Sequence, residues 1–382
     1  MGRLPTKLSQ KIEARKASNA LRSLPSKEGL VDFSSNDYLG FAQLDLIEDG
    51  ARKFLEDFKI VQHSATGSRL LSGNHKMYTA IEQELAEWFE AAVLVFNSGY
   101  DANLGLFGAV LQRGDVVLYD ELCHASIRDG IRLGNAKAFK FKHNDIDDLR
   151  AMVNRIRLNS DKGEIYVATE SVFSMDGDSP GLDELIALCD LEALNLIVDE
   201  AHAVGVYGKG LVQEGDLHQS VFARIVTFGK ALGSHGAAVI GSTALKQYLV
   251  NFARSFIYTT ALPPHGLARI MAAFDHLKGN IGLKAKNLLH QNIKHFKLRV
   301  AEYAMDRHFL DSHSPIQGVL IADNQRAKAC EAHCMANGFD VRAILSPTVP
   351  QGNERLRICL HSFNSSEEID NLIAAIARFC NG

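Results

Sequence analysis

The chain has 382 residues and carries 41 lysine and arginine residues against 45 aspartate and glutamate residues, a formal net charge of −4. This balance argues against a nucleic-acid-binding protein. The composition, with 46% hydrophobic and 23% charged residues, excludes a disordered or low-complexity chain. The length is enough for two or three domains and for a site between them, which favours an enzyme without identifying its reaction.

The sequence contains no sign of a membrane segment or of an oxidising compartment. No apolar stretch approaches the roughly 20 residues of a membrane-spanning helix, and the start, MGRLPTKLSQ, lacks the apolar core of a signal peptide. Six scattered cysteines are typical of reduced thiols. Cys330, His333 and Cys334 have helical spacing, which favours buried thiols over a zinc site. We therefore expect a cytoplasmic protein with no membrane partner and no metal.

The chain divides into three parts by pattern. Residues 1–45 combine a charged helical stretch with a turn-rich linker and predict an N-terminal arm. Between residues 46 and 280, short β-rich runs alternate with helical patterns, at 93–96, 116–120, 136–141, 164–170, 194–200, 224–228 and 237–241. This alternation predicts an α/β fold in which a mostly parallel, seven-stranded sheet lies between helices. Residues 281–382 predict a smaller α+β domain.

Three polar residues follow two neighbouring predicted strands. Asp199 and His202 come at the end of the run 194–200, and Lys230 follows the run 224–228. Ligands of open α/β sheets bind outside the carboxyl ends of the strands, so these side chains are expected at one edge. A strand-end aspartate often caps the next helix or turn, and His202 alone could be a hydrogen-bonded loop residue. Lys230, however, lies among small residues, an unusual place for a solvated charge.

A lysine and an aspartate at one strand edge fit the chemistry of pyridoxal phosphate. The lysine forms a Schiff base with the aldehyde, and the carboxylate keeps the pyridine nitrogen protonated. The turn with Gly99 and Tyr100, after a strand and at a helix start, exposes backbone N–H groups that suit the phosphate. His124 follows another strand and is a candidate to stack on the ring, although it could simply begin a helix.

Six motifs occur in order between residues 33 and 358: FSSNDYLG, TGSRLLSG, VFSMDGD, VDEAHAVGVYGKG, TFGKALG and SPTVPQGNERLRI. Together they resemble the α-oxoamine synthases, a family of fold-type-I pyridoxal phosphate transferases. The resemblance implies a homodimer with sites at the subunit interface, which joins an amino acid to an acyl thioester and releases carbon dioxide. Two segments, GSRLLSG and PTVPQGNERLRI, look most like the members that join L-alanine to a pimeloyl group carried by coenzyme A or an acyl-carrier protein.

The resemblance also implies roles for individual residues. At the cofactor, these are Lys230 as the Schiff-base lysine, Asp199 as the pyridinium partner, His202 and Ser174 at the ring hydroxyl, His124 stacked on the ring, and Gly99, Tyr100 and Thr227 at the phosphate, joined by Thr259 or Thr260 of the partner subunit. At the substrates, these are Arg357, in preference to Arg355, at the amino acid carboxylate, Arg22 at the distal carboxylate of the pimeloyl group, and Asn36 lining the site.

Other functions remain possible at this stage. A related α-oxoamine synthase would use glycine or serine with a different acyl thioester. An aminotransferase on the same fold would use a keto acid and release no carbon dioxide. A non-catalytic protein would have lost the cofactor, and the presence of Lys230, Asp199 and His202 argues against this last possibility.

Overall fold

The computed structural model describes residues 4–22, 24, 29–158 and 163–381. Within this range the chain forms two compact units. The larger consists of residues 37–174 and 178–287, and the smaller combines the N-terminal residues up to 36 with 175–177 and 288–382. The three-part division drawn from the sequence, into an arm, a large domain and a small domain with boundaries after residues 45 and 280, remains a prediction.

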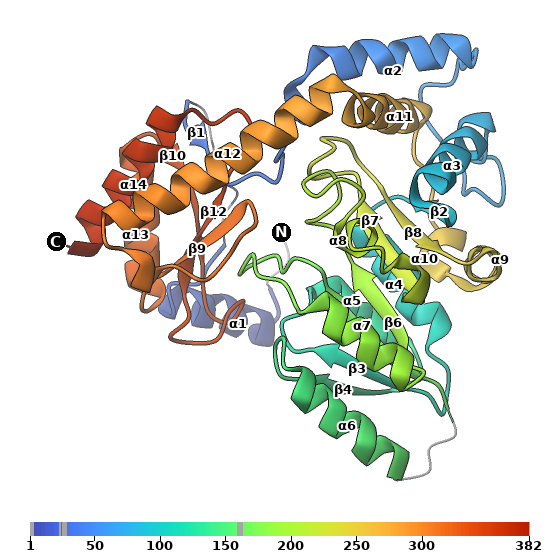
Figure 1. Cartoon of the computed structure of the whole chain (residues 1–382), viewed down its shortest axis with the longest axis horizontal. Coiled ribbons are helices and arrows are strands. Elements are labelled where there is room, and N and C mark those ends of the chain that lie inside the picture. The colour runs from blue at the N-terminus through green and yellow to red at the C-terminus, as the bar shows by residue number, and fades with distance from the viewer. Residues whose placement is uncertain (1–3, 23, 25–28, 159–162, 382) are drawn as a thin grey trace. The chain divides into compact units, whose positions relative to one another are not determined.

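The larger unit is built on a seven-stranded sheet with the order β2-β8-β7-β6-β5-β3-β4 (Figure 1). All seven predicted strands are present, with ends close to those expected, and five of them run parallel as neighbours. The strands are β2 (Ala92–Phe96), β3 (Val116–Asp120), β4 (Lys137–Phe141), β5 (Ile165–Glu170), β6 (Asn195–Asp199), β7 (Ala223–Thr227) and β8 (Ala237–Gly241). The predicted α/β class is therefore confirmed.

Strand β8 is the exception, because it runs antiparallel to both of its neighbours, β7 and β2. Only residues 228–236 connect it to β7. A parallel crossover needs about a dozen residues or more, so this short connection forces the chain to turn back directly. Lys230 lies in this connection, just beyond the carboxyl end of β7.

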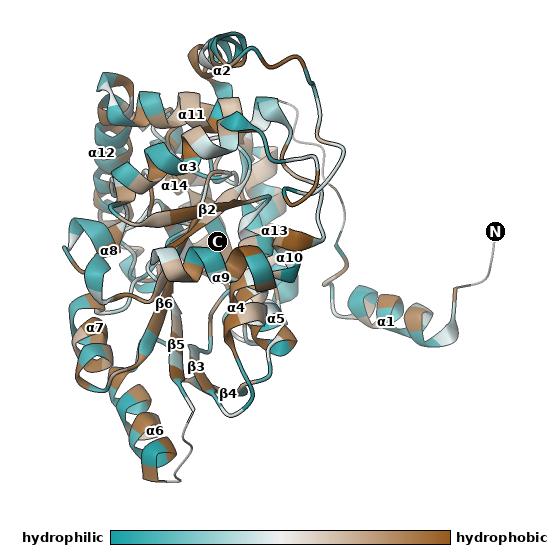
Figure 2. Ribbon diagram, turned by 90° about the vertical axis from the view of Figure 1, so that its right-hand side faces the viewer, coloured by the Kyte–Doolittle hydropathy of each residue, from teal (hydrophilic) through white to brown (hydrophobic). Residues whose placement is uncertain are grey.

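Alternate residues of the strands pack into two apolar cores, one on each face of the sheet. Leu94, Val117, Ile197 and Ile225 belong to one core, and Val116, Leu118, Leu196 and Val198 to the other. This alternation follows from the two-residue period of a β-strand. In Figure 2 the hydrophobic colour runs along β2 and β6, whereas the covering helices change colour from face to face.

Helices cover both faces of the sheet and extend beyond it. The helices of this unit are α2 (Asp45–Asp57), α3 (Lys76–Phe89), α4 (Gly99–Val110), α5 (Ala125–Leu133), α6 (Ile146–Leu158), α7 (Leu182–Leu191), α8 (Leu211–Glu214), α9 (Thr243–Phe252), α10 (Arg254–Ile257) and α11 (Pro264–Lys278), and α12 (Asn280–Glu302) begins in it. Helices α4, α5, α9 and α10 contribute to the first core, and α6 and α7 to the second.

The smaller unit contains a three-stranded antiparallel sheet with the order β11-β12-β9, and a parallel pair formed by β1 and β10. Its elements are α1 (Thr6–Ala17), β1 (Val31–Asp32), β9 (Ile316–Leu320), α13 (Asn324–Ala336), β10 (Phe339–Asp340), β11 (Arg342–Ile344), β12 (Arg355–Cys359) and α14 (Ser366–Asn381). The helix predicted around Cys330 and Cys334 is confirmed as α13, and both thiols are buried.

None of the helices in the described part of the chain combines the length and the apolar character that a membrane span requires.

Candidate active site

The carboxyl ends of β5, β6 and β7 form one wall of a cavity of about 190 Å³ in the larger unit. Seven of the residues predicted for the cofactor line this cavity: Gly99, Tyr100, His124, Asp199, His202, Thr227 and Lys230. Four further lining residues were missed from the sequence: Asn103, Ser126, Glu170 and Ala201. The structure thus brings these residues together at the carboxyl ends of the strands, where the strand-end rule expects ligands to bind.

Asp199, the last residue of β6, is held by two neutral donors. The Asn103 side-chain amide donates to its Oδ2 atom over 2.8 Å, and the backbone N–H of Ala201 donates to its Oδ1 atom over 3.0 Å. The side chain is only 5% exposed. The carboxylate is thus fixed in orientation at the wall of the cavity.

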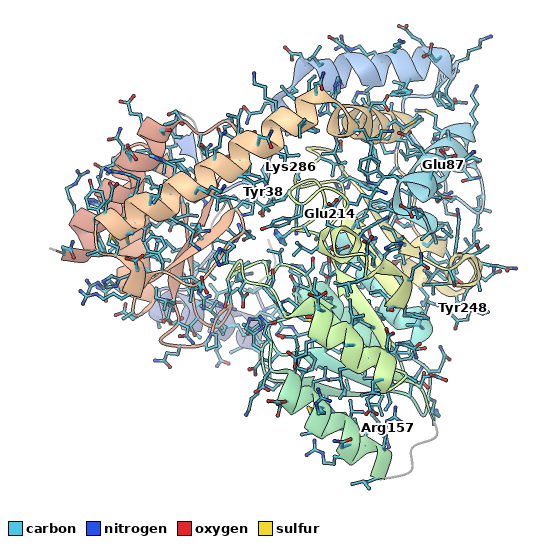
Figure 3. The ribbon with its side chains drawn as sticks, viewed as in Figure 1. Tyr38, Glu87, Arg157, Glu214, Tyr248 and Lys286 are labelled. Carbon is cyan, nitrogen blue, oxygen red and sulfur yellow. The ribbon has the colours of Figure 1, made fainter. Side chains whose placement is uncertain are left out.

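Lys230 and His202 contact each other across the cavity. Lys230 Nζ lies 2.5 Å from His202 Nε2, and His202 Nδ1 lies 2.8 Å from the hydroxyl of Tyr38. Tyr38 is fully buried and belongs to the motif SSNDYLG, where sequence reasoning did not single it out. Figure 3 labels this side chain. The three groups form a continuous path along which a proton can move between the lysine amine and the buried phenol.

Glu170 is the last residue of β5 and the neighbour of Asp199 in strand register. It is 3% exposed, and one of its carboxyl oxygens accepts a hydrogen bond of 2.6 Å from the backbone N–H of His124. Burial, together with the nearby charge of Asp199, raises the pKa of Glu170 to about 8. Sequence reasoning could have found this carboxyl by the strand-end rule that found Asp199.

His124 precedes the first turn of α5, as the helix-start alternative for this residue would have it, and it also lines the cavity. Its Nδ1 atom lies 2.7 Å from the hydroxyl of Ser126 and accepts the backbone N–H of the same residue over 3.3 Å. Burial lowers the pKa of His124 from its ordinary value. The imidazole is therefore suited to pack, uncharged, against an aromatic ring.

Gly99 and Thr227 form one end of the cavity. Helix α4 begins at Gly99, and the hydroxyl of its N-cap residue, Ser98, accepts the backbone N–H of Asp101 over 3.0 Å. A Cβ atom added to Gly99 would lie 3.8 Å from Thr227 Cβ, so the two residues are close neighbours. The first N–H groups of the helix and the threonine hydroxyl together suit a phosphate.

Three residues predicted for the cofactor lie outside the set that lines this cavity: Ser174, Thr259 and Thr260. Ser174 is buried. The side-chain amide of Asn97 donates to Thr259 Oγ1 over 3.2 Å and to the backbone oxygen of Thr260 over 2.5 Å. Ser174, Thr259 and Thr260 of the same chain therefore do not line this cavity.

The predicted substrate residues belong to the smaller unit. Arg357 is buried, and its guanidinium donates to Asn36 Oδ1 over 3.0 Å. Arg355, the alternative to Arg357, is instead paired with Asp176. The guanidinium of Arg22 donates to Thr348 Oγ1 over 3.2 Å. The structure thus brings Arg357 and Asn36 together.

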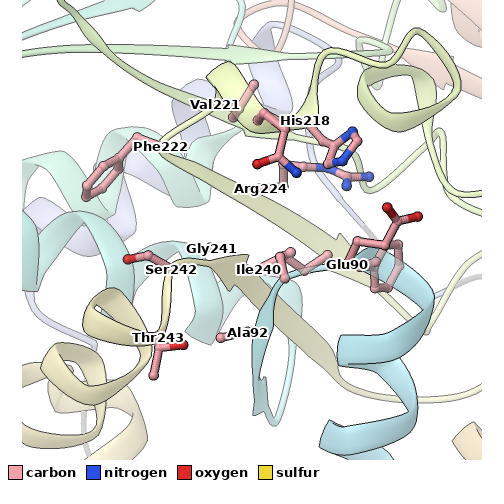
Figure 4. A pocket seen from close by; sticks show the side chains of 13 residues that line it. Glu90, Ala92, His218, Val221, Phe222, Arg224, Ile240, Gly241, Ser242 and Thr243 are labelled. Atoms are coloured by element: carbon pink, nitrogen blue, oxygen red, sulfur yellow. The ribbon is translucent and has the colours of Figure 1, made fainter.

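A larger cavity, of about 400 Å³, lies at the opposite edge of the sheet (Figure 4). It is found where β2 and β7 begin and β8 ends, and its described lining includes none of the predicted site residues. Size alone would therefore select the end of the sheet that lacks the predicted site residues. The smaller cavity is distinguished by its lysine, its histidines and its two buried carboxyl groups.

Comparisons with known proteins agree with the chemistry of the smaller cavity. The aminotransferase class I and II family matches residues 28–376. The chain is 40% identical to the 8-amino-7-oxononanoate synthase of Emericella nidulans over 94% of this chain and 91% of the relative. It is 35% identical to the 8-amino-7-oxononanoate synthase of Xylella fastidiosa, over 98% of this chain and 91% of the relative.

Solved structures extend this agreement to the fold. An 8-amino-7-oxononanoate synthase from Francisella tularensis superimposes with a TM-score of 0.77 and 27% identity, over 93% of this chain and 98% of that one. A serine palmitoyltransferase from S. paucimobilis, solved with a bound PLP–myriocin aldimine, shares the fold with a TM-score of 0.87 and 23% identity, over 98% and 97% of the two chains. The predicted fold-type-I architecture, the cofactor pyridoxal phosphate and the resemblance to α-oxoamine synthases are confirmed. The chain thus belongs to the aminotransferase class I and II family, within the group of pyridoxal-phosphate-dependent enzymes that includes the 8-amino-7-oxononanoate synthases.

Proposed function

We propose that this protein joins L-alanine to a pimeloyl thioester and releases carbon dioxide and the free thiol, giving 8-amino-7-oxononanoate for biotin biosynthesis. The observation that carries the proposal is the cavity that Lys230 and Asp199 both line. It occurs in a chain whose relatives of 35–40% identity include 8-amino-7-oxononanoate synthases.

The cofactor residues have complementary tasks in this proposal. Pyridoxal phosphate supplies a protonated ring that accepts the electron pair of a bond broken at the amino acid Cα. Lys230 would hold the cofactor through its amine and, when free, take the proton from Cα, a transfer helped by its proximity. Asp199 would bind the pyridine nitrogen and His124 would pack on the ring face. His202, with Ser174, would bind the ring hydroxyl.

The phosphate would be held by the N-terminus of α4 and by neighbouring hydroxyl groups. Gly99, Tyr100 and Thr227 would bind it from one chain, and Thr259 or Thr260 of the partner subunit would complete the site in a homodimer. The position of Gly99 beside Thr227 supports this arrangement.

The substrates would be held through their carboxylates. Arg357 would receive the amino acid carboxylate, because a guanidinium can bind both oxygens at once. Its contact with Asn36 supports the assignment of both residues to one site. Arg22 would meet the distal carboxylate of the pimeloyl group. The acyl group would arrive on coenzyme A or on an acyl-carrier protein. A cytoplasmic location is part of the proposal, and the six free cysteines support it.

A direct assay separates the proposed reaction from its alternatives. The purified dimer, loaded with pyridoxal phosphate, is incubated with alanine, glycine or serine and with pimeloyl, succinyl or palmitoyl thioesters. The products are identified by mass, and carbon dioxide is measured. We expect 8-amino-7-oxononanoate and equimolar carbon dioxide with alanine and a pimeloyl thioester. Preference for another amino acid or acyl group would identify a related α-oxoamine synthase, and transamination without carbon dioxide would overturn the proposal.

A further inference from the structure

Asn103 connects Asp199 with His124, two residues that have separate roles in the proposed function. It lies in α4 and is 1% exposed. Its side-chain nitrogen lies 2.8 Å from Asp199 Oδ2 and 3.0 Å from Ser126 Oγ. Ser126 in turn lies 2.7 Å from His124 Nδ1. One amide therefore links the carboxylate at the pyridine nitrogen to the imidazole at the ring face.

The directions of these hydrogen bonds follow from which groups can donate. An ionised carboxylate can only accept, so the Asn103 atom that faces Asp199 must be the NH₂ group, which has two protons to give. The second proton points to Ser126 Oγ, which therefore accepts from Asn103. The single hydroxyl proton of Ser126 is then available for His124 Nδ1. Since Nδ1 accepts, the proton of the neutral imidazole must be on Nε2.

The charge of His124 matters because a protonated ring would lie against it. Two positive rings in contact repel each other, whereas a neutral imidazole does not oppose a pyridinium. Burial lowers the pKa of His124. Donors that face Nδ1 also favour the neutral imidazole, because a hydrogen bond to the neutral form disfavours the charged one. The charged or titratable groups that face His124 are Asp199, Lys230, Arg128 and Asp129, and the carboxyl of Glu170 at its backbone N–H.

We propose that Asn103 and Ser126 are positioning residues that hold His124 as the neutral, Nε2-protonated tautomer while they orient the Asp199 carboxylate. The proposal rests on the roles suggested above for His124 and Asp199 at the cofactor. In this proposal the buried amide of Asn103 connects Asp199, at the pyridine nitrogen, with His124, on the face of the ring.

The test uses binding to the apoenzyme. The ligand is pyridoxamine 5′-phosphate, which has no aldehyde and cannot bond covalently to Lys230, and its affinity is measured by calorimetry between pH 6 and 8. Ser126→Ala removes the hydroxyl proton from His124 Nδ1 but keeps the burial of the ring and the longer contact from the backbone N–H of residue 126, so the pKa of the imidazole should rise part of the way toward its ordinary value of about 6.5. We expect the affinity, relative to the unaltered protein, to be up to about fourfold lower at pH 6 than at pH 8, which is the loss expected if the charged imidazole does not bind the ligand.

Two controls distinguish this effect from a general disturbance. Ser171 is another fully buried serine, and its hydroxyl has no hydrogen-bond partner among the residues that the structure describes, so Ser171→Ala should leave the pH profile unchanged. In a His124→Phe background the ring cannot be protonated, and Ser126→Ala should then add no pH dependence. An equal loss of affinity at every pH, or a pH effect that persists with phenylalanine at position 124, would overturn the proposal.

Asn103→Leu tests the proposed role of Asn103 in orienting the Asp199 carboxylate. It removes the donor to Asp199 as well as the donor to Ser126, so affinity should fall about tenfold at pH 8 and further at pH 6. Unchanged affinity at pH 8 would overturn the role toward Asp199. Because binding is measured without substrates, the result is independent of the proposed reaction: failure to form 8-amino-7-oxononanoate would leave these outcomes interpretable.

Discussion

Asp199 and Glu200 are adjacent carboxylates with opposite surroundings. Glu200 is 0% exposed, and its carboxylate accepts the Nε–H of Arg224 over 2.6 Å and the backbone N–H of Val212 over 3.0 Å. Asp199 accepts hydrogen bonds from neutral donors and faces a cavity that also contains Lys230. A buried carboxylate that is paired with a buried cation, as Glu200 is with Arg224, has a structural role. A carboxylate that faces a cavity, as Asp199 does, is available to a ligand.

The same contrast separates the two cavities. Arg224 lines the larger one, at the edge shown in Figure 4, but its guanidinium also donates to Gln213 Oε1 over 2.9 Å and to the Lys209 backbone oxygen over 2.6 Å. Its charge and donors are thus used within the protein. At the carboxyl edge, the pKa of Glu170 is raised and that of His124 lowered, which is typical of a functional site.

The largest expected effect comes from the lysine of the smaller cavity. Lys230→Ala should abolish the visible absorbance of lysine-bound cofactor and reduce turnover by at least about a thousandfold, because it removes the amine that we propose as both the covalent anchor and the base. Lys209→Ala is the matched control: Lys209 Nζ is paired with Glu90 over 2.9 Å, away from the smaller cavity. Spectra and steady-state kinetics of both variants provide the measurement, and substantial turnover by Lys230→Ala would refute the assignment.

The adjacent carboxylates can be separated by one isosteric change in each. Asp199→Asn should reduce turnover about a hundredfold, since it removes the charge that we propose acts on the cofactor, and should lower the free energy of unfolding by only about 1 kcal/mol, because the amide keeps one of the two hydrogen-bond acceptors. Glu200→Gln should instead leave Arg224 buried without its counter-ion and lower the free energy of unfolding by about 3 kcal/mol. Urea unfolding and steady-state kinetics are measured for both variants. The distinction between the two carboxylates is refuted if both variants lose mainly turnover or both lose mainly stability.

Much of this arrangement could be predicted from sequence, because it depends on local patterns. The β-rich runs predicted all seven strands, and the strand-end rule brought Asp199, His202 and Lys230 to one edge. Asn103 was missed because it lies in a mostly apolar helix, where its position toward the sheet is fixed by packing. Tyr38 was missed because its partner, His202, is distant in sequence. Such contacts depend on how the chain folds back on itself, which no local pattern records.

Glu170, the second buried carboxyl group of the smaller cavity, should make the free energy of unfolding depend on pH. The pKa of Glu170 is about 8 in the folded protein and ordinary in the unfolded chain, so the folded state binds one more proton between about pH 4.5 and 8. Stability should therefore fall as the pH rises through this window. Glu170→Gln cannot ionise and keeps an oxygen that can accept the His124 N–H. In urea unfolding of the apoenzyme, its stability relative to the unaltered protein should be about 3.5 kcal/mol better at pH 8 than at pH 5; the same difference at both pH values would contradict the assignment.

The smallest effect on turnover is expected at Tyr38, the buried end of the hydrogen-bonded path that runs from Lys230 through His202. Tyr38→Phe removes the hydroxyl 2.8 Å from His202 Nδ1, so the imidazole loses one constraint on its orientation and proton position. We expect turnover to fall three- to tenfold and the free energy of unfolding to fall by about 1 kcal/mol. Tyr78→Phe is a matched control, because Tyr78 is also buried and its hydroxyl accepts the Leu262 N–H over 2.8 Å. That control should lose similar stability with unchanged kcat. If both variants lose turnover equally, the hydroxyl of Tyr38 acts through packing alone, and the path from lysine to phenol has no part in the reaction.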